Sequence, residues 1–322
     1  MCTYNGAEFL PAQWESILAQ SRQPDEIVVC DDGSSDQTRS LLEKFAAETS
    51  IPVKLSFNQK NLGSVKNFEQ AIRLCTGSII ALSDQDDVWR DDKLQTIETA
   101  FNKSPHVGLV FSDAEIVDEQ LEPLGRRMWN EVCFEPYKRK LIARGRALEV
   151  LITGWTVTGA TMAFRSDFVN LSLPIPDGIA MIHDGWIALT VAAVAEVVPI
   201  DDPLIKYRQH ERQQIGAPAR PELAAQPRGI QGIDTAFRRR NSSAELHKIL
   251  ETLEERLLAH ARDYDTRKAL AFVSDYAFHL NVRANLPQRR LNRLPRILRE
   301  LLTRRYHEYA NGFKSAAKDL VS

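Results

Sequence analysis

The chain has 322 residues, enough for one large domain or for a domain with an appendage. Hydrophobic residues make up 43% and charged residues 26%, as in soluble globular proteins, and a net charge of −2 gives no bias toward nucleic acid as a partner. The four cysteines form no Cys-x-x-Cys pair, which argues against a zinc site and fits a reducing compartment. No apolar stretch approaches the roughly 18 residues of a membrane-spanning helix, and the N-terminus lacks a signal-peptide pattern, so we expect a cytoplasmic protein.

The first third of the chain alternates short apolar runs with helical patterns. Helices are predicted over residues 10–19, 37–48, 65–74 and 91–102, and strands over residues 26–30, 53–57, 78–82 and 107–112. This alternation predicts an α/β fold with a doubly wound, mostly parallel sheet flanked by helices. Ligands of such sheets bind beyond the carboxyl ends of the strands.

The beginning of the chain is short for this architecture. Asn5 and Gly6 form a turn signal, and a helical pattern follows at once. Only the first few residues remain for the strand that should precede the turn. We therefore expect a shortened first strand, or a chain that lacks residues upstream of Met1.

Beyond residue 115 the pattern changes three times. Residues 116–150 read as irregular and charged, and then strands are predicted over 156–164 and 203–207 with a helix over 185–195 between them. Residues 216–234 are rich in Pro, Gln and Arg and predict a mobile linker or lid. Residues 235–322 read as helical, so we expect a main domain over 1–215 and a helical C-terminal region.

An acidic cluster directly follows the apolar run 79–82. Asp84, Asp86 and Asp87 crowd negative charge at the expected ligand edge of the sheet, where like charges raise one another's pKa unless a cation joins them. A divalent ion such as Mg²⁺ or Mn²⁺ suits such oxygen ligands. In an extended segment, Asp84 and Asp86 point the same way and can share one site. The alternative is a solvated acidic turn that caps the next helix.

Five segments, in this order and spacing, resemble the family 2 glycosyltransferases, and most closely the bacterial rhamnosyltransferase-like members that build cell-surface polysaccharide. They are residues 2–6, 31–36, 61–63, 84–87 and 183–186, and residues 309–315 also look like the tail of that subgroup. The resemblance covers about residues 1–215 and implies a GT-A fold. It implies inverting, metal-dependent transfer of a sugar from a nucleotide-diphosphate donor, with dTDP-rhamnose as one candidate, to a glycan or lipid-linked acceptor.

The resemblance assigns residues to the donor. Thr3 and Tyr4 would line the base pocket, with the Tyr4 ring packed on the pyrimidine. Asp32 would accept a hydrogen bond from the base ring N–H. Asp84 would bind the ribose or support a metal ligand. The alternatives are a packed loop aromatic for Tyr4 and a helix cap for Asp32.

The resemblance also assigns the Mn²⁺ or Mg²⁺ site. Asp86 would bind the ion, which neutralises the leaving diphosphate, and His210 would be a further ligand. Arg208 would contact the diphosphate, since guanidinium suits phosphate oxygens. Asp87 is open between a ligand, a cap and a salt bridge, and a lone histidine such as His210 is as often structural.

By the same resemblance, Asp184 would be the base that takes a proton from the acceptor hydroxyl. A helix N-terminus stabilises the anionic form of a carboxylate, so burial would have to counter that effect. The alternative is a plain N-cap of the helix over 185–195. His183 stands where many relatives carry an acidic residue, which leaves its role open. Trp186 is open between the acceptor site and the core.

The C-terminal region carries eight arginines between Arg283 and Arg305 and one acidic residue, Glu300. Leucines recur there near helical spacing. A basic amphipathic helix is typical of membrane-surface binding, which would suit a lipid-linked acceptor at the inner face of the cytoplasmic membrane. The alternative is a helix that packs its leucines onto the main domain or a partner subunit.

Two other functions remain in view. A sugar nucleotidyltransferase would need a glycine-rich, basic phosphate loop near the first strand, whereas residues 5–11 contain one glycine and no Lys or Arg. A non-catalytic nucleotide-sugar-binding subunit would share the donor residues without transferring the sugar.

Overall fold

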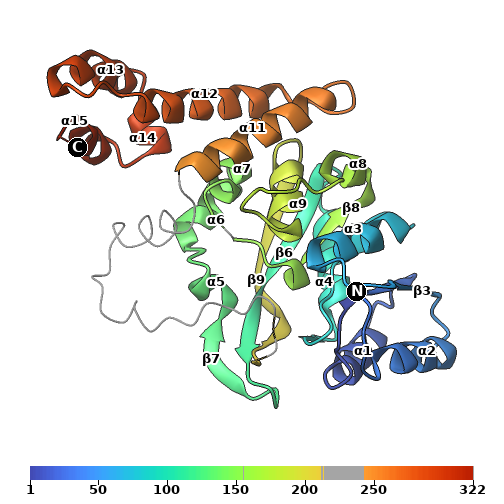
Figure 1. Ribbon diagram of the computed structural model, residues 1–322. Coiled ribbons are helices and arrows are strands. Elements are labelled where there is room, and N and C mark those ends of the chain that lie inside the picture. Colours follow the sequence, from blue (N-terminus) through green and yellow to red (C-terminus); the bar gives the residue numbers. More distant parts are fainter. Residues whose placement is uncertain (155, 212, 214–242, 322) are drawn as a thin grey trace. The chain divides into compact units, whose positions relative to one another are not determined.

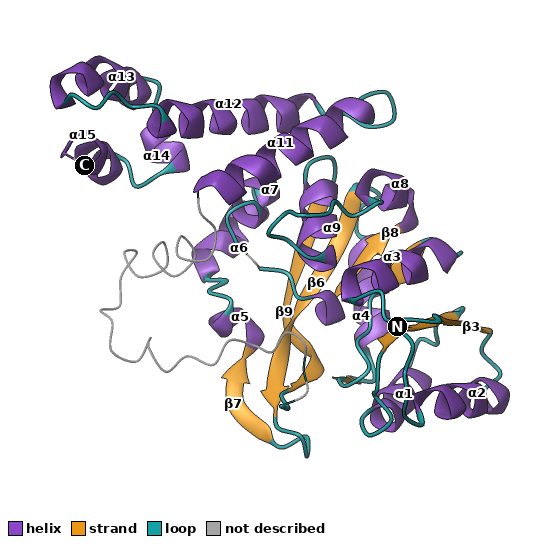
Figure 2. Cartoon of the chain, viewed as in Figure 1, coloured by secondary structure: helices purple, strands orange, loops and turns teal. Residues whose placement is uncertain are grey.

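The computed structural model describes residues 1–154, 156–211, 213 and 243–321 (Figure 1). It divides the chain into two compact units, one of Met1–Asp177 with Met181–Asp234 and one of Gly178–Ala180 with Thr235–Ser322. The strands lie in the first unit, and the described part of the second unit is helical (Figure 2). The predicted linker or lid over residues 216–234 lies outside the described residues.

A three-stranded parallel sheet forms the start of the first unit. Its strands are β1 (Cys2–Thr3), β2 (Ile27–Asp31) and β3 (Val53–Phe57), in that spatial order. β1 pairs with β2 in parallel although it has two residues, so the predicted short first strand is present. The helices of this part are α1 (Leu10–Leu18), α2 (Thr38–Glu48) and α3 (Ser64–Leu74).

A second, six-stranded sheet is mixed. Its order is β4 (Ile79–Ala81), β8 (Met162–Arg165), β6 (Val107–Val117), β9 (Glu196–Arg208) and β5 (Val88–Trp89), and β7 (Pro123–Arg127) pairs with β6. β6 and β9 run parallel, and the other four pairings are antiparallel. The α/β class with flanking helices is confirmed, but the prediction of a mostly parallel sheet is wrong here. The chain returns from β6 to β7 directly, without the crossover of about a dozen residues that a parallel neighbour requires.

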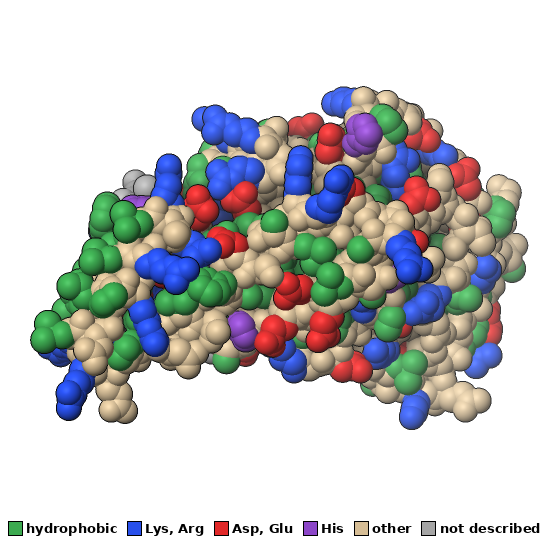
Figure 3. Space-filling model, turned by 90° about the horizontal axis from the view of Figure 1, so that it is seen from above, with side chains coloured by type: hydrophobic (Ala, Val, Ile, Leu, Met, Phe, Trp, Pro, Cys, Tyr) green, Lys and Arg blue, Asp and Glu red, His purple; other side chains and the backbone are tan. Residues whose placement is uncertain are grey.

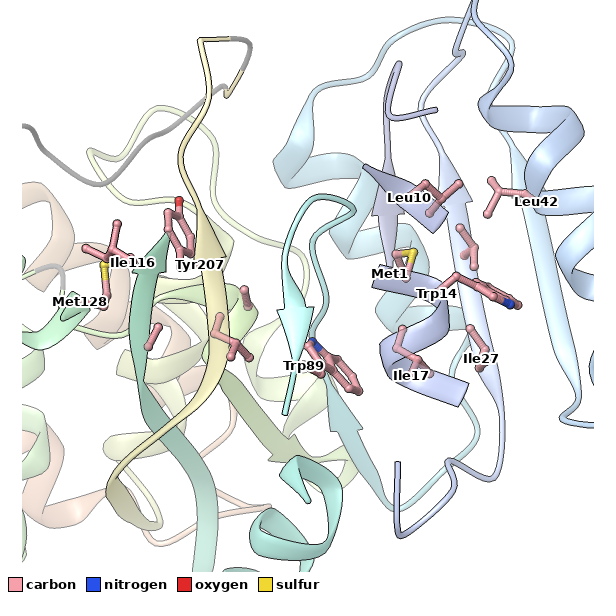
Figure 4. Close-up of a cluster of buried hydrophobic side chains, with 14 residues drawn as sticks. Met1, Leu10, Trp14, Ile17, Ile27, Leu42, Trp89, Ile116, Met128 and Tyr207 are labelled. Carbon is pink, nitrogen blue, oxygen red and sulfur yellow. The ribbon is translucent and has the colours of Figure 1, made fainter. Parts of the chain in front are cut away.

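The sheets meet where β1 lies beside the residues that follow β4. The amide of Cys2 donates to the carbonyl of Ser83 over 3.3 Å. One buried cluster draws on both sheets, with Trp14 and Ile27 from the first part and Trp89, Ile116 and Tyr207 from the second (Figure 4). This shared core holds the ends of β1, β4 and β9 in a fixed arrangement, and those ends carry the predicted site residues.

Two helices complete the support of the site. α4 (Lys93–Asn102) packs Ile97 and Phe101 against the second sheet. α9 (His183–Ala192) is buried on nearly all sides, as its mostly apolar sequence after Asp184 predicts. Trp186 of α9 is fully buried, and its indole N–H donates to the carbonyl of Ser172 over 2.8 Å. Trp186 is therefore a core residue in this structure.

Residues 116–150 hold more structure than predicted. Besides β7 they form α5 (Met128–Glu131), α6 (Pro136–Ile142) and α7 (Ala147–Leu151). These helices have 4 to 7 residues, too few to show a helical period in sequence. They form because the rings of Trp129 and Phe134 pack against Phe111 of β6, with centroid distances of 5.8 and 5.4 Å, and against each other at 4.8 Å. Three short elements follow: the 3-10 turns Gly159–Thr161 and Ser166–Phe168, and α8 (Val169–Ser172).

The second unit consists of α11 (Ser243–Ala259), α12 (Arg267–Ala284), α13 (Arg290–Leu302), α14 (Arg305–Tyr309) and α15 (Phe313–Val321). Its interior combines an apolar cluster, centred on Ile297 and Tyr306, with buried charges. Glu300 contacts His279 at 2.7 Å and Arg305 at 3.1 Å. None of the helices in the described ranges is both long and apolar enough to cross a bilayer.

Candidate active site

The acidic loop, residues 83–87, lies between β4 and β5 and is held by the end of β9. The backbone amide of Arg208 donates to Oδ1 of Asp87 over 3.1 Å, and its Nε donates to the carbonyl of Asp86 over 2.7 Å. Nε2 of His210 lies 2.9 Å from Oδ2 of Asp86. The structure therefore brings together Asp86 and His210, the two residues predicted to bind metal, across 124 residues of sequence.

Four carboxylates share one neighbourhood at this loop. Burial, together with the charges of Asp86 and Asp184, raises the pKa of Asp84 to about 7. Burial likewise raises the pKa of Asp87, with Asp86 and Asp84 adding to the effect. The pKa of the Tyr207 phenol is raised by burial and then by the same four carboxylates. Asp184 thus belongs to the electrostatic environment of the acidic loop although it lies on α9.

A buried lysine, which the sequence analysis treated as part of a helix start, lies near this charge. Lys93 is 0% exposed, its Nζ donates to the carbonyl of Ala160 over 2.7 Å, and it lies 3.9 Å from the centroid of the Trp89 ring. Burial lowers its pKa to about 7, while the carboxylates of Asp87 and Asp84 act in the opposite direction. Lys93 therefore supplies internal positive charge that partly balances the acidic loop.

The donor set fits a divalent cation that is shared with a ligand. Oδ2 of Asp87 and Nδ1 of His210 are buried without a hydrogen-bond partner among the described residues. The 2.9 Å between Asp86 Oδ2 and His210 Nε2 is close to the separation of two adjacent ligands on an octahedral ion, about 3.0 Å. In the described ranges no three His, Cys, Asp or Glu side chains group closely enough to hold a metal by themselves. An ion here would take its other ligands from substrate and water.

The predicted base-pocket residues lie at the end of β1 and in the turn after β2. Tyr4 is 40% exposed, so its ring face is accessible. Thr3 is buried, and its hydroxyl donates to Oδ2 of Asp31 over 2.8 Å. Asp32 is also buried and accepts hydrogen bonds from the amides of Leu62 and Gly63 at 2.8 and 2.9 Å, and from the Asn58 side chain at 3.0 Å. Asp32 therefore anchors the loop 61–63, and its contact with a base stays a prediction.

Gln85, which has no predicted role, joins Tyr4 to the acidic loop. Its Oε1 accepts from the amide of Tyr4 over 2.8 Å, and its Nε2 donates to the carbonyl of Tyr4 over 3.0 Å. The side-chain amide of Gln85 thus makes both hydrogen bonds to the Tyr4 backbone that a paired strand would make. Gly6 leaves room for it, because a Cβ there would lie 2.1 Å from Oε1 of Gln85.

Asp184 lies in the first turn of α9, whose N-cap is Ile182, so it is not the plain N-cap weighed above. Its Oδ2 accepts from the amide of Gly159 over 3.0 Å, and its Oδ1 accepts from the amide of Gly185 over 2.6 Å. Two backbone donors and the helix N-terminus hold the carboxylate in one orientation. The side chain of Asp184 is half-buried, so part of it stays exposed to solvent.

His183 and Arg208, next to these residues, are both buried. His183 is buried and stacks on Phe68 at 4.0 Å, and burial lowers its pKa, which favours a neutral ring. The side chain of Arg208 is 4% exposed and also donates to the carbonyl of Glu119. Arg208 thus fixes the acidic loop, while its contact with a diphosphate stays a prediction.

Comparison with known proteins assigns the family. The sequence model described as glycosyl transferase family 2 matches residues 1–169, more than half of the chain. The chain belongs to this family. The predicted family membership is therefore confirmed.

Two curated relatives of this family 2 protein align over about two thirds of its length. An uncharacterized glycosyltransferase of Nostoc sp. is 29% identical over 217 residues, which are 64% of this chain and 62% of the relative. The dTDP-rhamnosyl transferase RfbG of Shigella flexneri is 28% identical over 231 residues, which are 67% of this chain and 74% of the relative.

A shorter match and a solved structure complete the comparison. The UDP-Glc:alpha-D-GlcNAc-diphosphoundecaprenol beta-1,3-glucosyltransferase WfgD of Escherichia coli is 29% identical over 118 residues, 37% of this chain and 45% of the relative. The chain thus spans less than two thirds of the Nostoc and E. coli relatives. The structure of S. aureus TarS 1-349 in complex with UDP-GlcNAc has a TM-score of 0.54 at 15% identity and covers 98% of this chain and 89% of that one. This likeness confirms the GT-A fold.

Proposed function

We propose that this protein transfers a sugar, with inversion, from a nucleotide-diphosphate donor to a hydroxyl group of a glycan or lipid-linked acceptor in cell-surface polysaccharide synthesis. The observation that carries the proposal is the convergence of Asp84 and Asp86 of the acidic loop with Asp184 of α9 in one electrostatic neighbourhood. Family 2 membership supports it. The relative named a dTDP-rhamnosyl transferase makes dTDP-rhamnose the first donor to test.

The donor would lie along the ends of β1, β2 and β4. The exposed ring of Tyr4 offers a rigid stacking surface for the base, and the Gln85 pair keeps the Tyr4 backbone in register with the acidic loop. Thr3 and Asp32 would form the floor of the base pocket. Asp84, held near the metal residues, would bind the ribose.

Asp86 and His210 would hold the Mn²⁺ or Mg²⁺ ion together with the donor diphosphate. When bound, the ion neutralises the charge that develops on the leaving diphosphate. The chain's own contribution is orientation, because Arg208 fixes both the Asp86 backbone and the Asp87 carboxylate. Its buried side chain keeps the loop from turning its carboxylates away from the donor.

Asp184 would accept the proton of the attacking acceptor hydroxyl. The N–H groups of Gly159 and Gly185 fix both of its oxygens, so that the carboxylate meets the acceptor in one geometry. A base placed on the acceptor side, opposite the diphosphate, corresponds to inversion at the anomeric carbon.

The test is a donor screen followed by two isosteric substitutions. dTDP-rhamnose, UDP-glucose and UDP-GlcNAc are assayed with and without Mn²⁺, using a glycan acceptor. Asp184→Asn should lower the rate of transfer by roughly 10²–10⁴-fold while donor affinity by calorimetry stays unchanged. Asp86→Asn should abolish the Mn²⁺ dependence. Asp167→Asn, at an exposed aspartate in another short helical turn, is the matched control.

Full transfer activity of Asp184→Asn with the correct donor would show that Asp184 is not the base. Donor binding without transfer or hydrolysis in the unchanged protein would instead identify a non-catalytic nucleotide-sugar-binding subunit.

A further inference from the structure

α13 presents a row of leucines to solvent. Leu291 and Leu302 are 86% and 84% exposed, and Leu294 and Leu298 are 41% and 47% exposed. Their spacing of three and four residues places them along one face of the helix. We call these four residues the leucine row. So much exposed apolar surface on one helix is a cost in water unless something covers it.

The other face of α13 is anchored within the second unit. Ile297 packs with Tyr306 and Ala316, and the guanidinium of Arg293 donates to the carbonyls of Pro287 and Asp319 at 2.6 and 2.8 Å. The helix is therefore fixed by its own unit, and the leucine row is not needed for that packing.

Positive charge accompanies the leucine row. Five exposed arginines lie on α13 or directly beside it: Arg289, Arg290, Arg296, Arg299 and Arg304. Glu300, the one acidic residue in the sequence of this helix, is 1% exposed and lies against His279 and Arg305. Figure 3 shows hydrophobic side chains gathered at the left end, over α13, with Lys and Arg side chains among them. The surface is apolar and positive, without an exposed carboxylate from the helix.

A cavity lies at the edge of this face. It has a volume of about 250 Å³ between α12 and α13, and its lining includes Phe278, Arg296 and Arg299. Glu300 also lines it, but the carboxylate of Glu300 is paired with His279 and Arg305. The two guanidinium groups suit a phosphate group, because their planar N–H donors match its oxygens.

We propose that α13 docks this protein on an anionic membrane surface. The leucine row enters the boundary between headgroups and acyl chains, the arginines beside it contact lipid phosphates, and Arg296 and Arg299 receive one headgroup phosphate at the cavity. An anionic bilayer can both cover the leucine row and pair with the positive charge beside it. A second copy of the chain does not, because a two-fold contact would set the same arginines against one another. The proposal is independent of the transferase proposal.

The test is co-sedimentation of the full chain with vesicles of pure phosphatidylcholine, or of phosphatidylcholine with one quarter phosphatidylglycerol. The unchanged protein should bind the anionic vesicles and be released by high salt. Leu291→Gln with Leu302→Gln should weaken the partition coefficient at least about tenfold. Arg296→Gln with Arg299→Gln should weaken it about 25-fold, since each arginine near an anionic surface contributes about a factor of five.

Matched controls alter exposed residues elsewhere in the same unit. Leu258→Gln changes an exposed leucine of α11, and Arg262→Gln with Lys268→Gln removes the same charge as the arginine pair. Both controls should bind as the unchanged protein does. Anionic-vesicle binding that the leucine double variant leaves intact would overturn insertion of the row. Absence of vesicle binding, with a dimer in light scattering that the leucine variant dissociates, would show that a second copy covers α13.

Discussion

The contact between Gly6 and Gln85 allows a sharp test of how the two sheets are joined. Replacing Gly6 with Ala places a Cβ 2.1 Å from Oε1 and 2.4 Å from Cδ of Gln85, distances that no folded protein tolerates. The Gln85 side chain has to leave, and its two hydrogen bonds to Tyr4 are lost. At about 0.5–1.5 kcal/mol for each hydrogen bond, Gly6→Ala should lower the free energy of unfolding by about 1–3 kcal/mol.

The double-mutant cycle separates this mechanism from a general intolerance of Ala at position 6. Gln85→Ala alone removes the same two hydrogen bonds, so it should cost about as much. In the Gln85→Ala background, Gly6→Ala should cost close to nothing, since the three closest atoms to the new Cβ all belong to Gln85. The backbone of Gly6 is not among those with positive φ, so Ala adds no strain there. The coupling energy should therefore equal the single-mutant cost.

Urea unfolding followed by tryptophan fluorescence measures the four free energies. The four tryptophans among the described residues, Trp14, Trp89, Trp129 and Trp186, lie in the first unit, so their signal reports the part of the chain that contains the contact. Calorimetry with the donor should show the same pattern, because Gln85 holds the backbone of Tyr4. Costs that add to within about 0.5 kcal/mol would refute the reasoning, since independence is what unconnected sites show.

Two further substitutions test the charges of the site. Lys93→Met removes the buried amine and its hydrogen bond to the carbonyl of Ala160. The variant should therefore lower the free energy of unfolding of the first unit by roughly 2–4 kcal/mol, measured by urea unfolding. A variant as stable as the unchanged protein, or more stable, would show that Lys93 does not balance the carboxylates. Burial holds the pKa of His183 below its ordinary value of 6.5. Between about pH 7 and pH 5 the unfolded chain therefore binds a proton at His183 that the folded chain does not bind. The free energy of unfolding should fall as the pH drops through this range. His183→Leu should flatten that fall in the urea midpoint, and an unchanged slope would assign it to other groups.

The local elements of the first sheet could be predicted from sequence, whereas in the second sheet the extent and the pairing of the strands could not. The strand over 53–57 matches β3 at both ends, because its alternating apolar and polar residues are a local strand signal. β6 extends to Val117 and β9 begins at Glu196, beyond the predicted strands. These strands include polar residues such as Asp113, because residues elsewhere in the chain pair with them. Asp113 aligns with Pro203 of β9, and its carboxylate accepts a hydrogen bond from the amide of Trp129.

The same distinction holds within the site. Asp84 and Asp86 carry a local signal, because they follow an apolar strand, whereas Asp184 was assigned by the family resemblance, and the roles of all three stay predictions. Lys93 and Arg208 were not assigned their observed contacts, since these reach across 67 and 122 residues to the carbonyls of Ala160 and Asp86. A sequence pattern carries no information on which distant carbonyl a buried cation will meet.

The hold of Asp32 on the loop 61–63 has a consequence for ligand affinity. If Asp32 binds the base, as the family resemblance implies, the base draws on the same carboxylate oxygens that the amides of Leu62 and Gly63 use. Binding and loop order are then reciprocally linked, so that a change in either shifts the other by the same free energy. Gly63 has a φ of +84°, a backbone conformation that residues other than glycine rarely adopt. The loop is therefore a place where evolution or design can adjust the affinity for the nucleotide without altering any residue that touches it.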